Sequence, residues 1–190
     1  MRYPGIQKKY SGLPRIYEKE MNTDLGGGSF IFVCAQNDLF ADAIPADVIK
    51  RVLDHCNNYP ENKYLIQTKN PSRYLSYQRY LPKNFILGTT IESNRTYPEM
   101  GDTLSPFDRA DCLGSVALMG NKRFVTIEPV LDFDVVQFAD LLNRCNPRWI
   151  NIGADSGNNN LPEPPKEKID ELIKLLNGKI TIKKNMKRIK

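Results

Sequence analysis

Six short apolar segments, each followed at once by polar residues, constrain what this chain can fold into. They are residues 30–34, 64–66, 85–88, 124–127, 149–153 and 180–182. Strands of parallel α/β sheets are covered by helices, so they consist of continuous apolar residues. Ligands meet the carboxyl ends of such strands. The order, apolar first and polar last, therefore predicts parallel strands with a binding site at their carboxyl edge.

Amphipathic helical patterns fill the segments between these strands. After the first strand, apolar residues recur at three- and four-residue steps from Val48 to Cys56, which predicts a helix. Ser72, Ser105 and Asp134 stand where later helices begin, so we expect them to act as N-caps. An alternation of strand, helix and strand predicts right-handed βαβ units, and hence an α/β fold with a parallel sheet.

The length of the chain limits how far such a sheet can close. With 190 residues the chain can form one domain with a buried core. A complete eight-stranded α/β barrel usually needs about 250 residues, so six strands suit an open or partial barrel. We expect residues 1–28 to form a basic irregular arm, residues 29–185 the βα repeats and residues 186–190 a basic tail.

Composition excludes several classes of protein. The net charge of +5 favours anionic partners only weakly. The N-terminus has no apolar core of a signal peptide, and no apolar stretch approaches the ~20 residues of a membrane span. The four cysteines are scattered without a CxxC pair, which is typical of reduced cysteines in the cytoplasm. With one histidine, His55, we expect no zinc site.

If the strands are parallel, their polar ends share one rim. Carboxylates there can hold hydroxyls or an ammonium group, and cations can hold a carboxylate, which suits a small zwitterionic or sugar-bearing ligand. The rim residues are Gln36, Asn37, Asp38, Thr68, Lys69, Asn70, Thr89, Thr90, Glu92, Ser93, Asn94, Arg95, Glu128, Asp155, Ser156, Lys184 and Asn185.

Glu128 stands out because it closes an otherwise apolar strand and is followed by Pro129. Its carboxylate should point into or across the mouth of the barrel. A pairing with Lys69 or Lys184 would satisfy that charge. Such a pair suits a functional site and a structural scaffold equally well.

Five segments carry a resemblance to a known family. They are residues 30–40 (FIFVCAQNDLF), 65–73 (LIQTKNPSR), 86–94 (ILGTTIESN), 125–132 (VTIEPVLD) and 151–156 (NIGADS). In this order the chain, between residues 16 and 188, resembles the radical S-adenosylmethionine superfamily, and most closely its phage-associated, largely uncharacterised branch. The resemblance implies a partial (β/α)6 TIM-like barrel. It also implies S-adenosylmethionine and a 4Fe-4S cluster at the barrel mouth, where the cluster cleaves the cofactor to a radical that abstracts hydrogen from a substrate.

The resemblance also implies roles for individual residues. Gln36 and Asp38 fall near the methionyl amino group. Methionyl or ribose polar groups fall near four residues of the third segment: Thr89, Thr90, Glu92 and Ser93. Glu128, Asp155 and Ser156 fall on the adenosine side.

One departure from the family is large. The family binds its cluster through a CxxxCxxC loop after the first barrel strand, and this chain contains no such motif. Its first detected strand corresponds to the second strand of the family, so the first strand and the cluster loop would lie before Met1. The chain as given is then expected to be unable to hold a conventional cluster and to be inactive. It is either a truncated form of an active enzyme or a cluster-less remnant that binds something else.

Two other functions fit the residues. In a cluster-free barrel lyase or aldolase, Lys69 would be the amine nucleophile and Glu128 the base. In a nucleic-acid-binding module, Lys8, Lys9 and the basic segment 183–190 would contact phosphates. The sequence indicates neither a substrate nor an oligomeric state. A missing first strand would leave an open apolar edge near residues 30–34.

Overall fold

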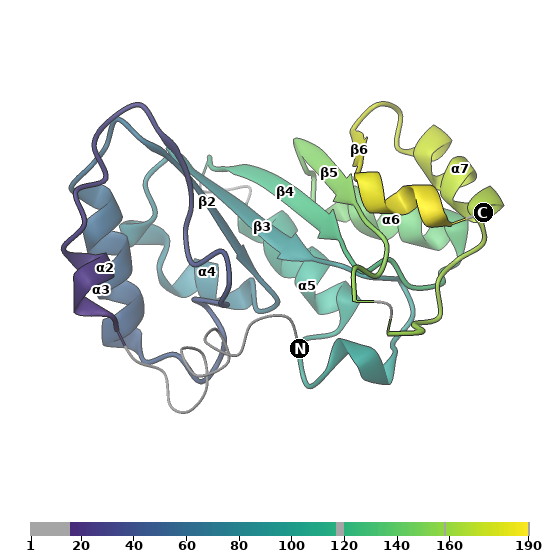
Figure 1. Cartoon of the computed structure of the whole chain (residues 1–190), viewed down its shortest axis with the longest axis horizontal. Coiled ribbons are helices and arrows are strands. Elements are labelled where there is room, and N and C mark those ends of the chain that lie inside the picture. The colour runs from purple at the N-terminus through teal and green to yellow at the C-terminus, as the bar shows by residue number, and fades with distance from the viewer. Residues whose placement is uncertain (1–15, 117–119, 158, 190) are drawn as a thin grey trace.

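The computed structural model describes residues 16–116, 120–157 and 159–189 (Figure 1). Six strands form one sheet in the order β1–β2–β3–β4–β5–β6, and every neighbouring pair is parallel. The predicted parallel α/β sheet is therefore confirmed. The sheet is curled into a half-barrel. Its strands are Phe30–Phe32, Lys63–Thr68, Phe85–Thr90, Lys122–Ile127, Trp149–Ile152 and Ile180–Ile182.

Helices connect the strands and cover the convex face of the sheet (Figure 1). The described residues contain six α-helices, of which α2 precedes β1 and each of the others joins two consecutive strands. Their bounds are Glu18–Met21 (α2), Ala46–Asn57 (α3), Ser72–Ser76 (α4), Pro106–Ser115 (α5), Val135–Arg144 (α6) and Lys166–Leu175 (α7). Short 3-10 helices are Gln78–Tyr80 (η1), Pro98–Met100 (η2) and Lys184–Arg188 (η4).

Alternate residues of each strand point to opposite faces of the sheet. The face covered by helices holds the core, where each central strand contributes side chains that are at most 1 % exposed. These include Tyr64, Ile66, Phe85, Leu87, Val125, Ile127, Ile150 and Ile152. Burial of these residues supplies the main stabilisation of the fold, at about 25 cal/mol per Å² of apolar surface.

The opposite face of the sheet is concave, and we call it the inner face. Its side chains form three rows that run across neighbouring strands at matched register. The rows are Phe32–Leu65–Ile86–Lys122, Gln67–Gly88–Phe124–Trp149 and Thr90–Thr126–Asn151–Thr181. The inner face thus changes from apolar near the amino ends of the strands, through an aromatic row, to polar near their carboxyl ends.

Of the three predicted N-caps, one forms its capping hydrogen bond in the structure and two do not. Ser105 is an N-cap, since its hydroxyl accepts a hydrogen bond from the Asp108 N–H at 3.1 Å. The prediction for Ser72 is wrong, because Pro71 occupies the N-cap position and Ser72 lies inside α4. Asp134 occupies the N-cap of α6, but its side chain accepts no hydrogen bond from a helical N–H. Its carboxylate binds the Arg95 guanidinium instead. Such charge-assisted hydrogen bonds are stronger than bonds to a neutral amide.

The ends of the chain are partly ordered into helices. Of the predicted arm, residues 1–15 lie outside the described residues, and α2 follows them. Residues 186–188 of the predicted basic tail belong to the 3-10 helix η4, in which Met186 is buried. Among the described residues, no helix combines the length and the apolar character needed to cross a bilayer.

Candidate functional site

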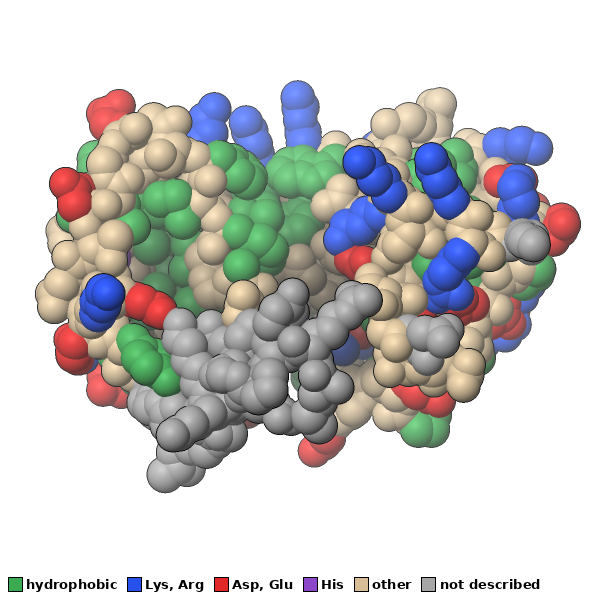
Figure 2. All heavy atoms as spheres, in the orientation of Figure 1, with side chains coloured by type: hydrophobic (Ala, Val, Ile, Leu, Met, Phe, Trp, Pro, Cys, Tyr) green, Lys and Arg blue, Asp and Glu red, His purple; other side chains and the backbone are tan. Residues whose placement is uncertain are grey.

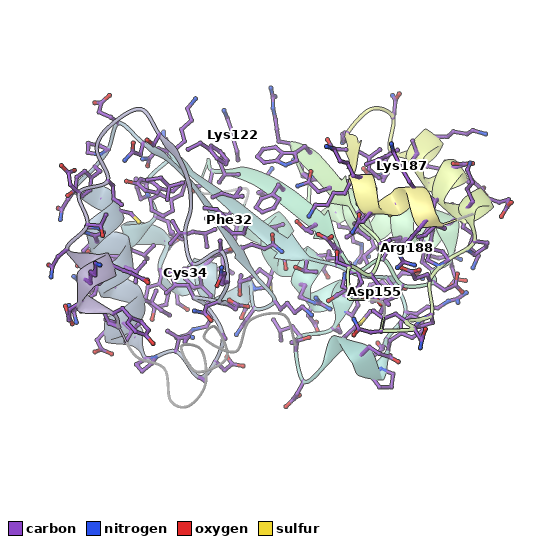
Figure 3. The ribbon with its side chains drawn as sticks, in the orientation of Figure 1. Phe32, Cys34, Lys122, Asp155, Lys187 and Arg188 are labelled. Atoms are coloured by element: carbon purple, nitrogen blue, oxygen red, sulfur yellow. The ribbon has the colours of Figure 1, made fainter. Side chains whose placement is uncertain are left out.

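A pocket of about 260 Å³ lies at the carboxyl ends of β1, β2 and β3. It lies at the predicted edge of the sheet, beside the loop that contains Cys34 (Figure 3). Cys34 adopts a left-handed backbone with φ of 52°, and its carbonyl accepts a hydrogen bond from the Asn37 N–H, which turns the chain over the pocket. The pocket is lined by Phe32, Cys34, Ala35, Gln36, Asn37, Asp38, Gln67, Thr68, Lys69 and Thr90.

Asp38 holds two walls of this pocket together. One of its carboxylate oxygens accepts a hydrogen bond from the Phe40 N–H at 3.0 Å, and the other accepts one from the Lys69 N–H at 2.8 Å. The first bond fixes the loop after β1, and the second ties it to the loop after β2. Asp38 therefore lines the pocket as predicted, but both of its oxygens already serve the scaffold.

A chain of three charges leads from the pocket into the core. Lys69 Nζ lies 2.7 Å from Glu92 Oε1, and Glu92 Oε2 lies 2.9 Å from an Nη atom of Arg109. The Lys69 side chain is 35 % exposed, whereas those of Glu92 and Arg109 are 2 % and 0 % exposed. Arg109 also donates a hydrogen bond to the Thr90 carbonyl at 2.6 Å. Arg109 thus anchors Glu92, and Glu92 in turn positions the ammonium group of Lys69 in the pocket wall.

The polar end of the inner face forms the floor of the site. Gln67 donates from Nε2 to the Thr90 hydroxyl at 2.6 Å, and the Thr126 hydroxyl donates to Gln67 Oε1 at 3.2 Å. These bonds fix the amide of Gln67 across three strands. The arrangement leaves hydroxyl and amide groups on the floor that can bind the hydroxyls of a ligand.

Glu128 belongs to a second polar cluster at the ends of β4, β5 and β6. Its carboxylate forms an ion pair with Lys183 and accepts hydrogen bonds from Asn185 Nδ2 at 3.0 Å and the Ser156 hydroxyl at 3.4 Å. The predicted pairing with Lys69 or Lys184 is therefore wrong. Lys69 is taken by Glu92, and Lys183, one residue earlier than Lys184, follows β6 directly.

Gly153 makes room for this second cluster. A Cβ atom there would lie 2.7 Å from Glu128 Oε1, so the carboxylate rests directly against the end of β5. The Ser156 and Asn185 side chains then close around it, because Asn185 Nδ2 also donates to the Ser156 hydroxyl at 3.0 Å. Sequence reasoning found all of these residues except Lys183, but assigned Glu128 the wrong partner.

Three further predicted site residues belong neither to the pocket, nor to the Lys69–Glu92–Arg109 chain, nor to the Glu128 cluster. The Thr89 side chain is on the helix-covered face and its hydroxyl donates to the Thr68 carbonyl at 2.7 Å. The Ser93 hydroxyl is buried and donates to the Asp132 carbonyl at 2.6 Å. Asp155 accepts bonds from the N–H groups of Gly157 and Asn159 and so stabilises its own loop.

The hydrogen bonds of Asp155 also stabilise its ionised form. Burial acts to raise the pKa of Asp155, but the bonds from Asn159 and Gly157 outweigh it, so the pKa lies below its usual value. Asp134, in the loop after β4, behaves similarly: hydrogen bonds from Arg95 and Asn94 lower its pKa to about 2. Both groups are ionised at neutral pH and bind neighbouring loops together.

Sequence reasoning missed Gln67, Thr126 and Arg109. The sequence gives a weak indication for Gln67 and Thr126. Each lies between strand residues whose side chains face the helices, so its own side chain must face the inner side of the sheet. The indication for Arg109 is stronger. Its helical spacing places it on the same buried face of α5 as Pro106, Ala110 and Leu113. A buried arginine requires a carboxylate partner.

The cysteines do not converge. All four cysteines lie in the described residues, and none of them forms a disulfide. The single histidine also lies in the described residues. Cys34 lines the pocket, Cys56 and Cys112 lie on α3 and α5, and Cys145 ends α6. Among the described residues there is no group of three His, Cys, Asp or Glu side chains that could hold a metal ion.

Cys34 should react slowly with alkylating reagents at neutral pH. Burial, and then the charges of Glu20 and Asp38, raise its pKa from 9.0 to about 11. Because the thiolate is the nucleophile, a rise of this size lowers the reactive fraction about 100-fold relative to a model thiol. Iodoacetamide labelling followed by peptide mass spectrometry should show a Cys34 rate that keeps rising beyond pH 9. A rate that levels off near pH 8 would contradict this environment.

Together these features define a class: an α/β protein with an all-parallel half-barrel sheet and a polar pocket at its carboxyl edge. Within that class, the chain belongs to the family described as "Protein of unknown function (DUF5131)", whose model matches residues 14–168, most of the 190-residue chain. A search of the curated proteins found no match.

Proposed function

We propose that the pocket at the ends of β1, β2 and β3 binds the amino-acid part of S-adenosylmethionine. The observation that carries this proposal is the Lys69–Glu92–Arg109 chain, which holds one ammonium group in the wall of a polar pocket. In the same proposal, the half-barrel is a partial (β/α)6 TIM-like barrel of the radical S-adenosylmethionine type. Its β1 then corresponds to the second strand of that family.

Each part of the ligand has a complementary group near the pocket. Lys69 Nζ is the group for the ligand carboxylate, because Glu92 orients it and the Lys69 side chain is 35 % exposed. The side-chain oxygens of Gln36 and Asn37 suit the ligand ammonium group. Thr90 and Gln67 offer a hydroxyl and an amide for the ribose. A cation at one position and neutral amide oxygens at another match the carboxylate and the ammonium group of a zwitterion.

The described residues do not fit the 4Fe-4S cluster that accompanies this cofactor in the radical family. A cluster needs several thiolates around one centre. Only Cys34 lies at the pocket, and the raised pKa of its thiol opposes the thiolate form. S-adenosylmethionine by itself supplies activated carbon–sulfur bonds at its sulfonium centre.

The alternative of a Schiff-base lyase has less support. A lysine that attacks a carbonyl must be a free amine, usually desolvated or beside another cation. Lys69 is instead ion-paired with Glu92. Glu128, the proposed base, is ion-paired with Lys183 in the separate cluster at the ends of β4, β5 and β6.

Titration calorimetry with S-adenosylmethionine and S-adenosylhomocysteine tests the proposal. We expect saturable binding of one ligand per chain. Lys69→Met should weaken it by roughly 10- to 100-fold, the usual value of a hydrogen bond to a charged group. The matched control is Lys50→Met, which removes an exposed lysine paired with Asp54 on α3 and should leave binding unchanged. No binding to wild-type protein, or equal binding by Lys69→Met, would refute the proposal.

A further inference from the structure

The inner face of the sheet exposes aromatic side chains, of which only Phe32 also lines the ligand pocket. Phe30 is 59 % exposed, and Phe32, two residues further along the same face of β1, is 42 % exposed. Trp149 is half-buried, and its ring stacks on Phe124 with centroids 5.5 Å apart and planes 15° apart. Figure 2 shows hydrophobic side chains gathered in a hollow in the middle of this face. Large exposed apolar patches on a monomer usually mark an interaction site.

Gly88 explains why the aromatic row is flat. A Cβ atom at Gly88 would lie 1.9 Å from Phe124 Cε1, so the Phe124 ring lies directly on the backbone of β3. Phe124 is 1 % exposed there and supports Trp149 from beneath. The indole is thus held in a fixed plane on the inner face, which is the arrangement that a stacking partner requires.

Unpaired lysines lie on the inner face near the aromatic side chains and on η4, which follows β6. Lys63 pairs in register with Phe30 and Lys122 with Ile86, so both stand on the inner face near the amino ends of their strands. Lys184 and Lys187 are exposed on η4. None of the four has an ion-pair partner among the described residues. In Figure 3, Lys122 lies near Phe32, whereas Lys187 lies on η4 at the C-terminal end of the sheet, and Figure 2 shows lysines and arginines along the rim of the hollow.

We propose that the inner face binds single-stranded nucleic acid, with bases stacked on Phe30, Phe32 and Trp149 and phosphates held by the bordering lysines. Aromatic platforms flanked by cations are the usual means of binding single strands, because every base has a π-face. A duplex would keep its bases stacked within itself and could not reach the rings. An apolar protein partner would leave the lysines unpaired. The polar side chains of Asn151 and Thr181, in the row beyond the ligand pocket, add donors and acceptors for base edges.

The single tryptophan of the chain gives a direct readout. Titration with an oligothymidylate of about 15 nucleotides should quench Trp149 fluorescence to saturation, since the base stacks on the indole itself. Phe30→Ala should weaken binding about tenfold. Phe30 does not line the ligand pocket, so this change leaves the S-adenosylmethionine site intact.

The salt dependence of oligonucleotide binding tests whether the lysines contact phosphates. The double variant Lys63→Gln/Lys122→Gln should reduce the slope of log K against log salt by about 1.4, the value for two phosphate contacts on a single strand. The matched control, Lys50→Gln/Lys166→Gln, removes two exposed lysines from the helical layer and should leave the slope unchanged. Lys69→Met should bind the oligonucleotide as wild type does. Loss of S-adenosylmethionine binding with oligonucleotide binding retained would therefore count against the proposed function alone, and the reverse result would count against this inference alone.

Several results would overturn this inference. Binding without quenching of Trp149, equal affinity for heparin or duplex DNA, or equal slopes in the two double variants would each show attraction by net charge alone. Absence of binding at low salt would also contradict it. Adsorption to anionic vesicles in place of the oligonucleotide would assign the face to a different partner.

Discussion

Replacing Arg109 with methionine is expected to lower the free energy of unfolding by about 3–5 kcal/mol. The guanidinium is 0 % exposed and lies 2.9 Å from a Glu92 oxygen. Its removal leaves a buried carboxylate with Lys69 as its only remaining ion-pair partner among the described residues, and the Thr90 carbonyl loses a hydrogen bond. The change should lower the melting temperature by about 10 °C for a chain of this size.

A double-mutant cycle separates the lost charge pair from lost packing. Glu92→Gln/Arg109→Met removes both buried charges, so it should be clearly more stable than Arg109→Met alone. Arg144→Met is the matched control: Arg144 pairs with Asp111 on the surface, where such pairs contribute at most about 1 kcal/mol. Urea unfolding of wild type, Glu92→Gln, Arg109→Met, the double variant and Arg144→Met gives the comparison. If Arg109→Met costs no more than Arg144→Met, the buried chain of charges does not stabilise the fold.

Replacing Gly88 with alanine should destabilise the protein by about 2–3 kcal/mol, because the added methyl overlaps the Phe124 ring. The overlap involves three ring atoms, at 1.9, 2.4 and 2.5 Å from the ideal Cβ position. The ring is held against the stacked indole of Trp149, so it can give way only by disturbing that pair. Thermal unfolding followed by circular dichroism should show a melting temperature lower by about 5–10 °C.

Two further variants identify the cause. In Gly88→Ala/Phe124→Leu the conflicting ring atoms are gone, so the double variant should lose less stability than the two single changes added together. Gly27→Ala is the control glycine, since a Cβ atom there meets only Glu61 at an ordinary 3.4 Å. Additive losses in the double variant would mean that the ring does not lie against Gly88.

The fold was largely predictable because parallel strands carry a strong local signal. All six apolar segments are strands, and the polar residues after each lie at one edge of the sheet, as the order of apolar and polar residues indicates. The boundaries were less predictable. The first strand ends at Phe32, two residues before the end of its apolar segment, because the left-handed turn at Cys34 stops the pairing.

The site was predictable as a place but not as a set of contacts. Thr89 and Thr90 are adjacent in the sequence, yet one faces the helices and the other the pocket, since a strand alternates its faces. Which of two neighbours faces the pocket depends on register, and the sequence does not state the register. The partners of charged groups were also hidden, because Glu128 and Lys183 are 55 residues apart.

Two surfaces of the half-barrel therefore have separate roles in this account. We propose that the polar pocket at the carboxyl edge binds a small zwitterionic ligand at Lys69, and that the aromatic inner face binds an extended chain of bases. Their adjacency would bring a nucleic-acid substrate close to an S-adenosyl ligand, and Phe32, which borders both surfaces, marks the point where they meet.

The most direct test of the central claim is the position of S-adenosylhomocysteine in a crystal structure of the complex. The account predicts ligand density at the carboxyl ends of β1, β2 and β3, with the ligand carboxylate within hydrogen-bond distance of Lys69 Nζ. Density at the amino ends of the strands, on the helical layer, or around Glu128 with the Lys69–Glu92 pair untouched would contradict it.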